Sequence, residues 1–192
     1  MEKGARILAR DCAKVKDGEA VLVVTDEVRL PIAEIVKKAA EEAGGNATLV
    51  ISPPRKIDNQ EPVEEVSAAM RRADVIIMPV THALSHTRAV REAIGEGARV
   101  LSMTAFTENM MKTGGLMADF SARKPLCDAL ANRLTAAVEV RVTNAAGTEL
   151  EMSLEGRAGN SHCCIVESPG FSAVPNIEAN TSPKDGTTQG RL

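Results

Sequence analysis

Two histidines stand in the stretch 81–91, the first part of the chain whose side chains could perform chemistry. The pattern predicts a helix that begins here, with Ser85 or Thr87 as its cap and His86 in its first turn. Free main-chain N–H groups at such a helix end favour an anion, such as a carboxylate, and the neutral form of a histidine. His86 is therefore a candidate acid/base or hydrogen-bonding residue, and a surface histidine beside a capped helix is the alternative. Nothing in the sequence around His82 fixes an orientation for it.

Glu178 is the second candidate, in the strand-like stretch 176–182. A buried carboxylate without a partner is costly, and a divalent metal is one partner that suits carboxylate oxygens. A salt bridge, or exposure on an edge strand, is the alternative. His162 and Glu167, on the neighbouring predicted strand, could approach Glu178. Alternate strand residues share a face, so Asn180 should make the surroundings of Glu178 polar.

The elements that must position His86 alternate between strand and helix through residue 137. Strands are expected at 20–25, 47–52, 74–79 and 98–102, with helices at 30–43, 62–72, 85–96 and 119–137. Strands that are apolar throughout and spaced by helices predict a parallel sheet covered on both faces. Residues 1–137 are thus expected to form a Rossmann-like α/β domain with five buried strand residues: Val21, Val23, Val75, Ile77 and Val100. Ligands gather at the carboxyl ends of such strands, but no glycine-rich dinucleotide or P-loop motif follows any of them.

Residues 138–192 have a different pattern, in which apolar and polar residues alternate on both sides of the turn 144–147. This pattern predicts a β-hairpin, and two further strands are expected at 162–168 and 176–182. A few antiparallel strands without a covering helix leave a sheet face and edges open. The segment is therefore expected to be the mainly antiparallel start of a second, incomplete domain, which shares its chemistry with a continuation that this chain lacks.

The bulk composition excludes several classes of protein. The chain has 192 residues, of which 44% are hydrophobic and 26% charged, with a net charge of −3, which is typical of a globular protein. Scattered lysines and arginines give no footprint for nucleic acid, and only three Phe, with no Tyr or Trp, disfavour base stacking. There is no signal-peptide core and no apolar stretch of membrane-spanning length. A cytoplasmic protein with reduced thiols and no membrane association is expected.

Motifs along nearly the whole chain resemble those of the aminopeptidase T family of metallo-aminopeptidases, also called leucyl aminopeptidases. The stretches that carry the resemblance are 4–12, 73–81, 84–88, 142–150, 167–170 and 178–190. The resemblance implies a hydrolase that removes N-terminal residues from peptides with zinc, cobalt or magnesium. It also implies that Glu178 is a metal ligand, although Thr-Ser-Pro stands after it where the family has Ala-Pro. A homodimer is the expected assembly.

The family's remaining metal ligands have no counterpart before Leu192. The chain is therefore expected to be the N-terminal portion of such an enzyme, inactive alone. Two alternatives stay open. The 2,5-dihydroxypyridine dioxygenases look similar over this architecture and use a single ferrous ion, and His86 would then act as a base on the substrate. A non-catalytic binding or oligomerisation module is the other.

Overall fold

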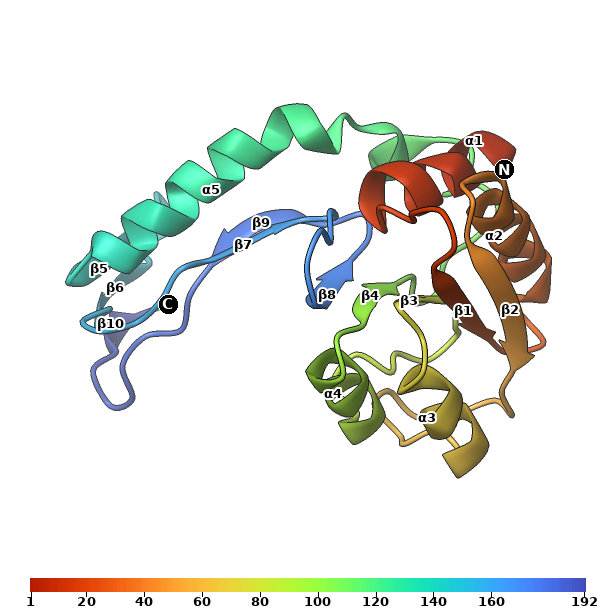
Figure 1. Cartoon of the computed structure of the whole chain (residues 1–192). Coiled ribbons are helices and arrows are strands. Elements are labelled where there is room, and N and C mark those ends of the chain that lie inside the picture. Colours follow the sequence, from red (N-terminus) through yellow and green to blue (C-terminus); the bar gives the residue numbers. More distant parts are fainter. The chain divides into compact units, whose positions relative to one another are not determined.

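The computed structural model describes all residues, Met1–Leu192, and the chain divides into two compact units (Figure 1). Unit 1 comprises Met1–Phe120 and Cys164–Asn176, and unit 2 comprises Ser121–Cys163 and Ile177–Leu192. None of the helices combines the length and the apolar character that crossing a membrane requires.

Unit 1 is built on a five-stranded sheet with the order β2-β1-β3-β4-β8, in which every neighbouring pair is parallel. The strands are β1 (Ala20–Thr25), β2 (Asn46–Ile51), β3 (Val75–Met78), β4 (Arg99–Ser102) and β8 (Gly170–Ala173). The predicted parallel α/β sheet is confirmed. In this order the strand sequence reverses between β1 and β3, which is the usual place for a ligand in such sheets.

Helices cover both faces of this sheet, as the apolar strands demand. The helices are α1 (Glu2–Arg6), the π-helix η1 (Ile7–Cys12), α2 (Leu30–Glu42), α3 (Glu64–Met70), α4 (Arg88–Gly95) and the 3-10 helix η2 (Gly114–Met117). One core cluster joins α3 and α4 to strand residues such as Leu22, Ile76 and Val100. α1 and α2 lie together on the other side (Figure 1). All five strand residues predicted to be buried are at most 2% exposed, and each contributes roughly 1.5–3 kcal/mol.

Strand β8 is the strand of the unit 1 sheet that the sequence did not predict. The expected strand at 162–168 is the shorter β7 (Asn160–Cys163), and the chain then returns to unit 1, where Phe171 pairs with Val100. β8 is only four residues long and begins at Gly170, directly after Pro169, and a Pro-Gly dipeptide is typical of turns. The units differ from the contiguous ranges 1–137 and 138–192 in two respects, since 164–176 returns to unit 1 and 121–137 belongs to unit 2.

Unit 2 contains the long helix α5 (Phe120–Ala136) and two small antiparallel sheets. The predicted hairpin is present as β5 (Glu139–Thr143) and β6 (Glu149–Ser153), and β10 (Gln189–Arg191) extends it to three strands. Asn144 closes the turn, where its Oδ1 accepts the N–H groups of Ala146 and Thr148. The second sheet is a two-stranded ladder of β7 and β9 (Ile177–Asn180).

Candidate functional site

The carboxyl ends of β1 and β3 meet at the point where the strand order reverses, and Asp26 ties them together. Its Oδ2 accepts the main-chain N–H of Thr81 at 2.6 Å, and its Oδ1 lies 3.0 Å from the Thr81 hydroxyl. Asp26 also accepts the N–H groups of Val28 and Arg29, so this buried carboxylate is already fully engaged. The cavity beside it measures about 10 Å³, room for roughly one water molecule. The position is thus a structural junction of the fold.

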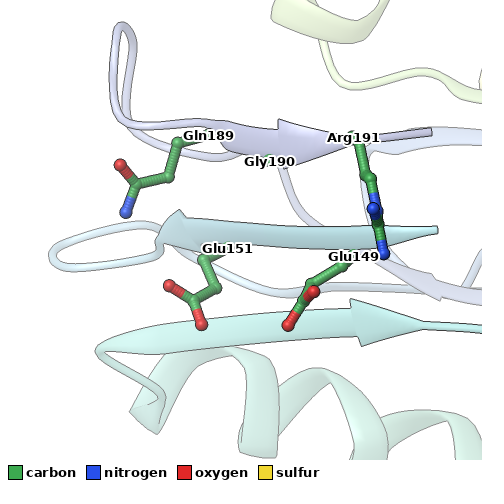
Figure 2. Close-up of a pocket in the computed structure, with 5 residues that line it drawn as sticks. All are labelled: Glu149, Glu151, Gln189, Gly190 and Arg191. Carbon is green, nitrogen blue, oxygen red and sulfur yellow. The ribbon is translucent and has the colours of Figure 1, made fainter. Parts of the chain in front are cut away.

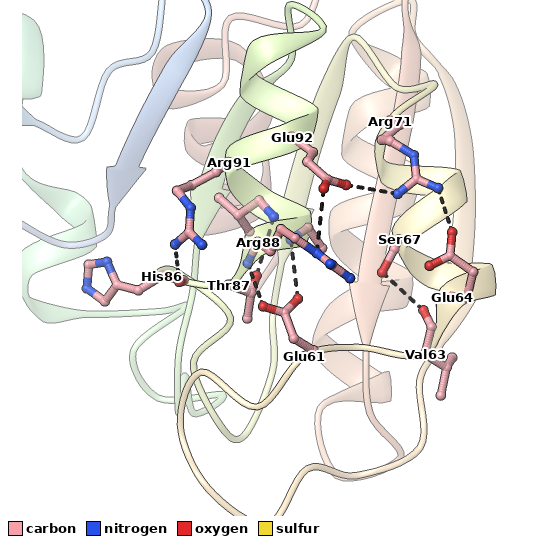
Figure 3. Close-up of polar contacts among 12 residues, drawn as sticks. Glu61, Val63, Glu64, Ser67, Arg71, His86, Thr87, Arg88, Arg91 and Glu92 are labelled. Carbon is pink, nitrogen blue, oxygen red and sulfur yellow. Dashed lines mark hydrogen bonds and ion pairs between the residues drawn. The ribbon is translucent and has the colours of Figure 1, made fainter.

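His86 lies in front of α4 and not in its first turn. The cap of α4 is Thr87, whose side chain accepts the N–H of Val90, so the second of the two predicted caps is confirmed. The helix begins at Arg88, three residues after the predicted start at Ser85. The Thr87 hydroxyl donates to the Leu84 carbonyl at 2.7 Å, which fixes the turn before the helix. The His86 imidazole is exposed and points away from these contacts (Figure 3).

The expected anion site at the N-terminus of α4 is filled by the chain itself. The Glu61 carboxylate accepts the main-chain N–H groups of Arg88 at 2.6 Å and of Ala89 at 3.3 Å (Figure 3). The expectation that these N–H groups are free is therefore wrong, because a side chain 27 residues earlier in the sequence satisfies them. His82 is also oriented, since its Nδ1 lies 3.4 Å from Asp58 Oδ1.

Glu178 lies on the ladder of unit 2, where it is exposed and faces a polar surface. It pairs in register with His162 on β7, so the two side chains project from the same face. The carboxylate of Glu178 accepts a hydrogen bond from Asn180 Nδ2 at 2.8 Å, and Asn160 Nδ2 donates to Asn180 Oδ1 at 3.1 Å. No lysine or arginine pairs with Glu178 in unit 2, and Glu167 lies beyond the end of β7, outside this ladder.

The other face of the same ladder is held by α5. Cys127 donates to the main-chain carbonyl of Glu178, and Asp128 accepts the hydroxyl of Ser161 at 2.7 Å. The pKa of Asp128 is lowered by its hydrogen bonds from Lys124 and Ser161. The polar face that carries Glu178 therefore points away from the helix.

A cavity of about 460 Å³ on the hairpin sheet was not predicted from the sequence (Figure 2). Glu149 and Glu151 on β6 and Gln189 and Arg191 on β10 line it. The two glutamates are ion-paired with Arg141, whose pKa is raised mainly by its hydrogen bond to Glu149. The alternating charges compensate one another, and no group here has the environment of a catalytic acid or base.

A metal site must be tested against the donors that the chain provides. Glu178 and His162 are of suitable type, since ferrous oxygenases commonly use two histidines and one carboxylate. However, no three His, Cys, Asp or Glu side chains come together in a way that could hold a metal. The residues of this chain fit a metal in type but not in number.

The comparisons with known proteins give one family match and two similar solved structures. A family model for 2,5-dihydroxypyridine 5,6-dioxygenase matches residues 8–192. The solved 2,5-dihydroxypyridine dioxygenase of Pseudomonas putida KT2440 is similar, with a TM-score of 0.82, 16% identity, and coverage of 98% of this chain and 57% of that chain. Wild-type AmpT from Thermus thermophilus is also similar, with a TM-score of 0.65, 15% identity, and coverage of 98% of this chain and 62% of that chain. No curated protein sequence matches. The chain spans less than two thirds of either solved chain, and at these identities the likeness shows the fold alone.

These findings correct the expected function. The predicted aminopeptidase function and hydrolase class are wrong, because the family model that matches is that of a dioxygenase. Zinc, cobalt and magnesium gain no support from this match. The error has a physical reason, since one architecture carries both chemistries and most of the motifs used for the resemblance describe the architecture. The chain belongs to the 2,5-dihydroxypyridine 5,6-dioxygenase family.

Proposed function

We propose that this chain carries part of the active site of a ring-cleaving dioxygenase that acts on a dihydroxylated pyridine ring with iron(II) as its metal. The observation that carries this proposal is the family match over residues 8–192. The chain spans 57% of the similar dioxygenase structure, so we propose that residues outside 1–192 complete the site. A divalent metal fits a family of dioxygenases, because a bound ferrous ion supplies redox chemistry with dioxygen that side chains lack.

Glu178 is the proposed ligand from this chain. Its carboxylate is exposed, forms no ion pair within unit 2, and is oriented by Asn180 through a 2.8 Å hydrogen bond. Such a neighbour fixes the direction of a ligand and tunes its strength. His162 pairs directly with Glu178 across the ladder, so its imidazole projects from the same face as the Glu178 carboxylate. Two donors are too few for a complete site, so further ligands are required.

His86 is the proposed base for a hydroxyl proton of the ring. Its imidazole is exposed, while its main chain is held at both ends: the N–H donates to Asn59 Oδ1 at 2.9 Å and the carbonyl accepts from Arg91 Nη1 at 2.7 Å. An imidazole titrates near neutral pH, which suits proton transfer. This role stays a proposal that the substitution of His86 can test.

The proposed function is tested by anaerobic titration with iron(II) of a protein in which residues 1–192 are joined by the segments proposed to complete the site. Glu178→Gln keeps the shape of the side chain and removes its charge, and Glu167→Gln is the matched control on an exposed position in unit 1. We expect wild type and the control to bind iron, and Glu178→Gln to bind at least about tenfold more weakly, a difference of about 1.4 kcal/mol. Equal binding by all three proteins would reject Glu178 as a ligand. Failure of 2,5-dihydroxypyridine to bind the iron-loaded wild type would reject the substrate class.

A further inference from the structure

A short loop between β2 and α3 is bound along the segment that carries His86. This clamp loop, Asp58–Glu61, contacts residues 82–89 through its side chains and its backbone. At one end, Asp58 Oδ1 accepts the N–H of Ala83 at 2.8 Å. At the other end, the Glu61 carboxylate caps α4, as described above. The two ends of the segment are thereby fixed to one loop.

Asn59 occupies the middle of the clamp loop and touches the segment twice. Its own N–H donates to the Ala83 carbonyl at 2.6 Å, and its Oδ1 accepts the N–H of His86 at 2.9 Å. Its φ of 61° is in the left-handed region, which asparagine adopts more readily than most residues. A residue kept in this region needs surrounding contacts to hold it, and here the two hydrogen bonds do so.

The consequence for His86 is a main chain held by hydrogen bonds beneath an exposed imidazole. Asn59 holds its N–H and Arg91 holds its carbonyl, while the imidazole extends away from the Arg91 side chain (Figure 3). A group that transfers a proton must stand within a fraction of an ångström of its productive position, and only its supporting contacts can ensure this. The hydrogen bond from His86 to Asn59 is the contact that comes from outside the segment itself.

We propose that Asn59 is a positioning residue that sets the place and direction of His86. This inference rests on the proposed function, in which His86 accepts a proton from the substrate. Asn59 acts only through His86 and Ala83 and contacts no substrate itself. Its effect is thus expected in the geometry and ligand response of His86, and not in the stability of the whole fold.

The test uses the full 192-residue chain, labelled with ¹⁵N, and three substitutions. Asn59→Ala removes the acceptor, whereas Asn59→Asp keeps a side-chain oxygen and tolerates the left-handed conformation. Gln60→Ala is the matched control, because Gln60 accepts only the N–H of Lys56 within the loop. The readouts on this chain are amide hydrogen exchange at Ala83 and His86, the imidazole signals of His86, and the melting temperature. The response of the His86 signals to 2,5-dihydroxypyridine is measured in the protein whose site is completed by the residues outside 1–192.

We expect Asn59→Ala to speed exchange of the His86 amide by about fivefold to tenfold and to alter its imidazole signals. The melting temperature should fall by only about 2–4 °C, because alanine in the left-handed region costs about 1 kcal/mol. Asn59→Asp should restore both the exchange and the signals, and Gln60→Ala should match wild type. The inference would be overturned if Asn59→Ala left both the amide exchange and the imidazole signals of His86 identical to those of wild type. A fall in melting temperature without any local change at His86 would also overturn it. If the substitution changes His86 as expected but 2,5-dihydroxypyridine leaves the wild-type imidazole signals unmoved, Asn59 positions His86 and the proposed role of His86 in catalysis fails.

Discussion

At the scale of single residues, neighbouring side chains in this protein have opposite tasks. Thr87 is 1% exposed and forms hydrogen bonds to both Leu84 and Val90, so it builds the start of α4. His86, the residue before it, is exposed and gives only its main chain to the structure. A residue with a free side chain on a fixed main chain is available for function.

This contrast predicts different results for two adjacent substitutions. His86→Ala should change the free energy of unfolding by no more than about 0.5 kcal/mol, as is usual at exposed positions. Thr87→Ala should cost about 1 kcal/mol or more, because it removes the cap of α4 and a buried hydroxyl contact. Urea unfolding of both variants measures the difference. A large loss of stability in His86→Ala would mean that its imidazole is structural.

At the scale of elements, strand β4 carries a charge into the core. Arg99 is 7% exposed, donates to the carboxylate of Glu19 and also binds the carbonyls of Ala13 and Lys14. Burial opposes ionisation of Glu19, but the hydrogen bonds from Arg99 and from the Lys16 main chain, with the positive charges of both residues, together outweigh it and lower the pKa of Glu19. This pair joins β4 to the segment before β1.

The lowered pKa of Glu19 gives a pH dependence with a definite sign. Because the pKa of Glu19 is lower in the folded protein than its ordinary value of 4.5, its ionised carboxylate stabilises the fold at pH values above 4.5. This stabilisation is lost as the pH falls from 4.5 through the lower pKa of the folded state. Arg99→Met should destabilise the protein by roughly 2 kcal/mol at neutral pH and flatten this acid slope. Urea unfolding between neutral and acidic pH measures both. A slope below pH 4.5 that Arg99→Met leaves unaltered would show that other carboxyl groups dominate.

At the scale of the whole molecule, apolar exposure is concentrated in unit 2. Leu126 and Leu130 on α5 are 61% and 46% exposed, and Val142 and Ile177 are also exposed. Contiguous exposed apolar residues commonly mark sites of protein association. We propose, as expected from the sequence, that the chain self-associates, with the leucines of α5 at the contact.

Sedimentation velocity over a range of concentrations tests this association. Leu126→Gln with Leu130→Gln should shift the protein toward the monomer, because it removes apolar area from the contact. Val28→Gln, at a position 65% exposed in unit 1, is the matched control and should leave association unchanged. A wild type that stays monomeric at every concentration would reject self-association.

Local patterns in the sequence were enough to predict most of the elements. Strands such as β1 and β3 are apolar on both faces, and this requires a parallel sheet under two layers of helices. The hairpin β5–β6 follows from alternation around a turn that Asn144 closes with its own side chain. Each of these signals lies within a few residues of the chain, so the sequence alone determined them.

Contacts between distant segments were decided only by the tertiary structure. Glu61 reaches the N-terminus of α4 and fills the site that the sequence left open to a ligand. β8 joins the sheet of unit 1 because its backbone pairs with β4, although its four residues show no strand pattern. Glu178 faces His162 because of the register of β7 and β9. Pairing across such separations depends on how whole elements pack, and no local periodicity records it.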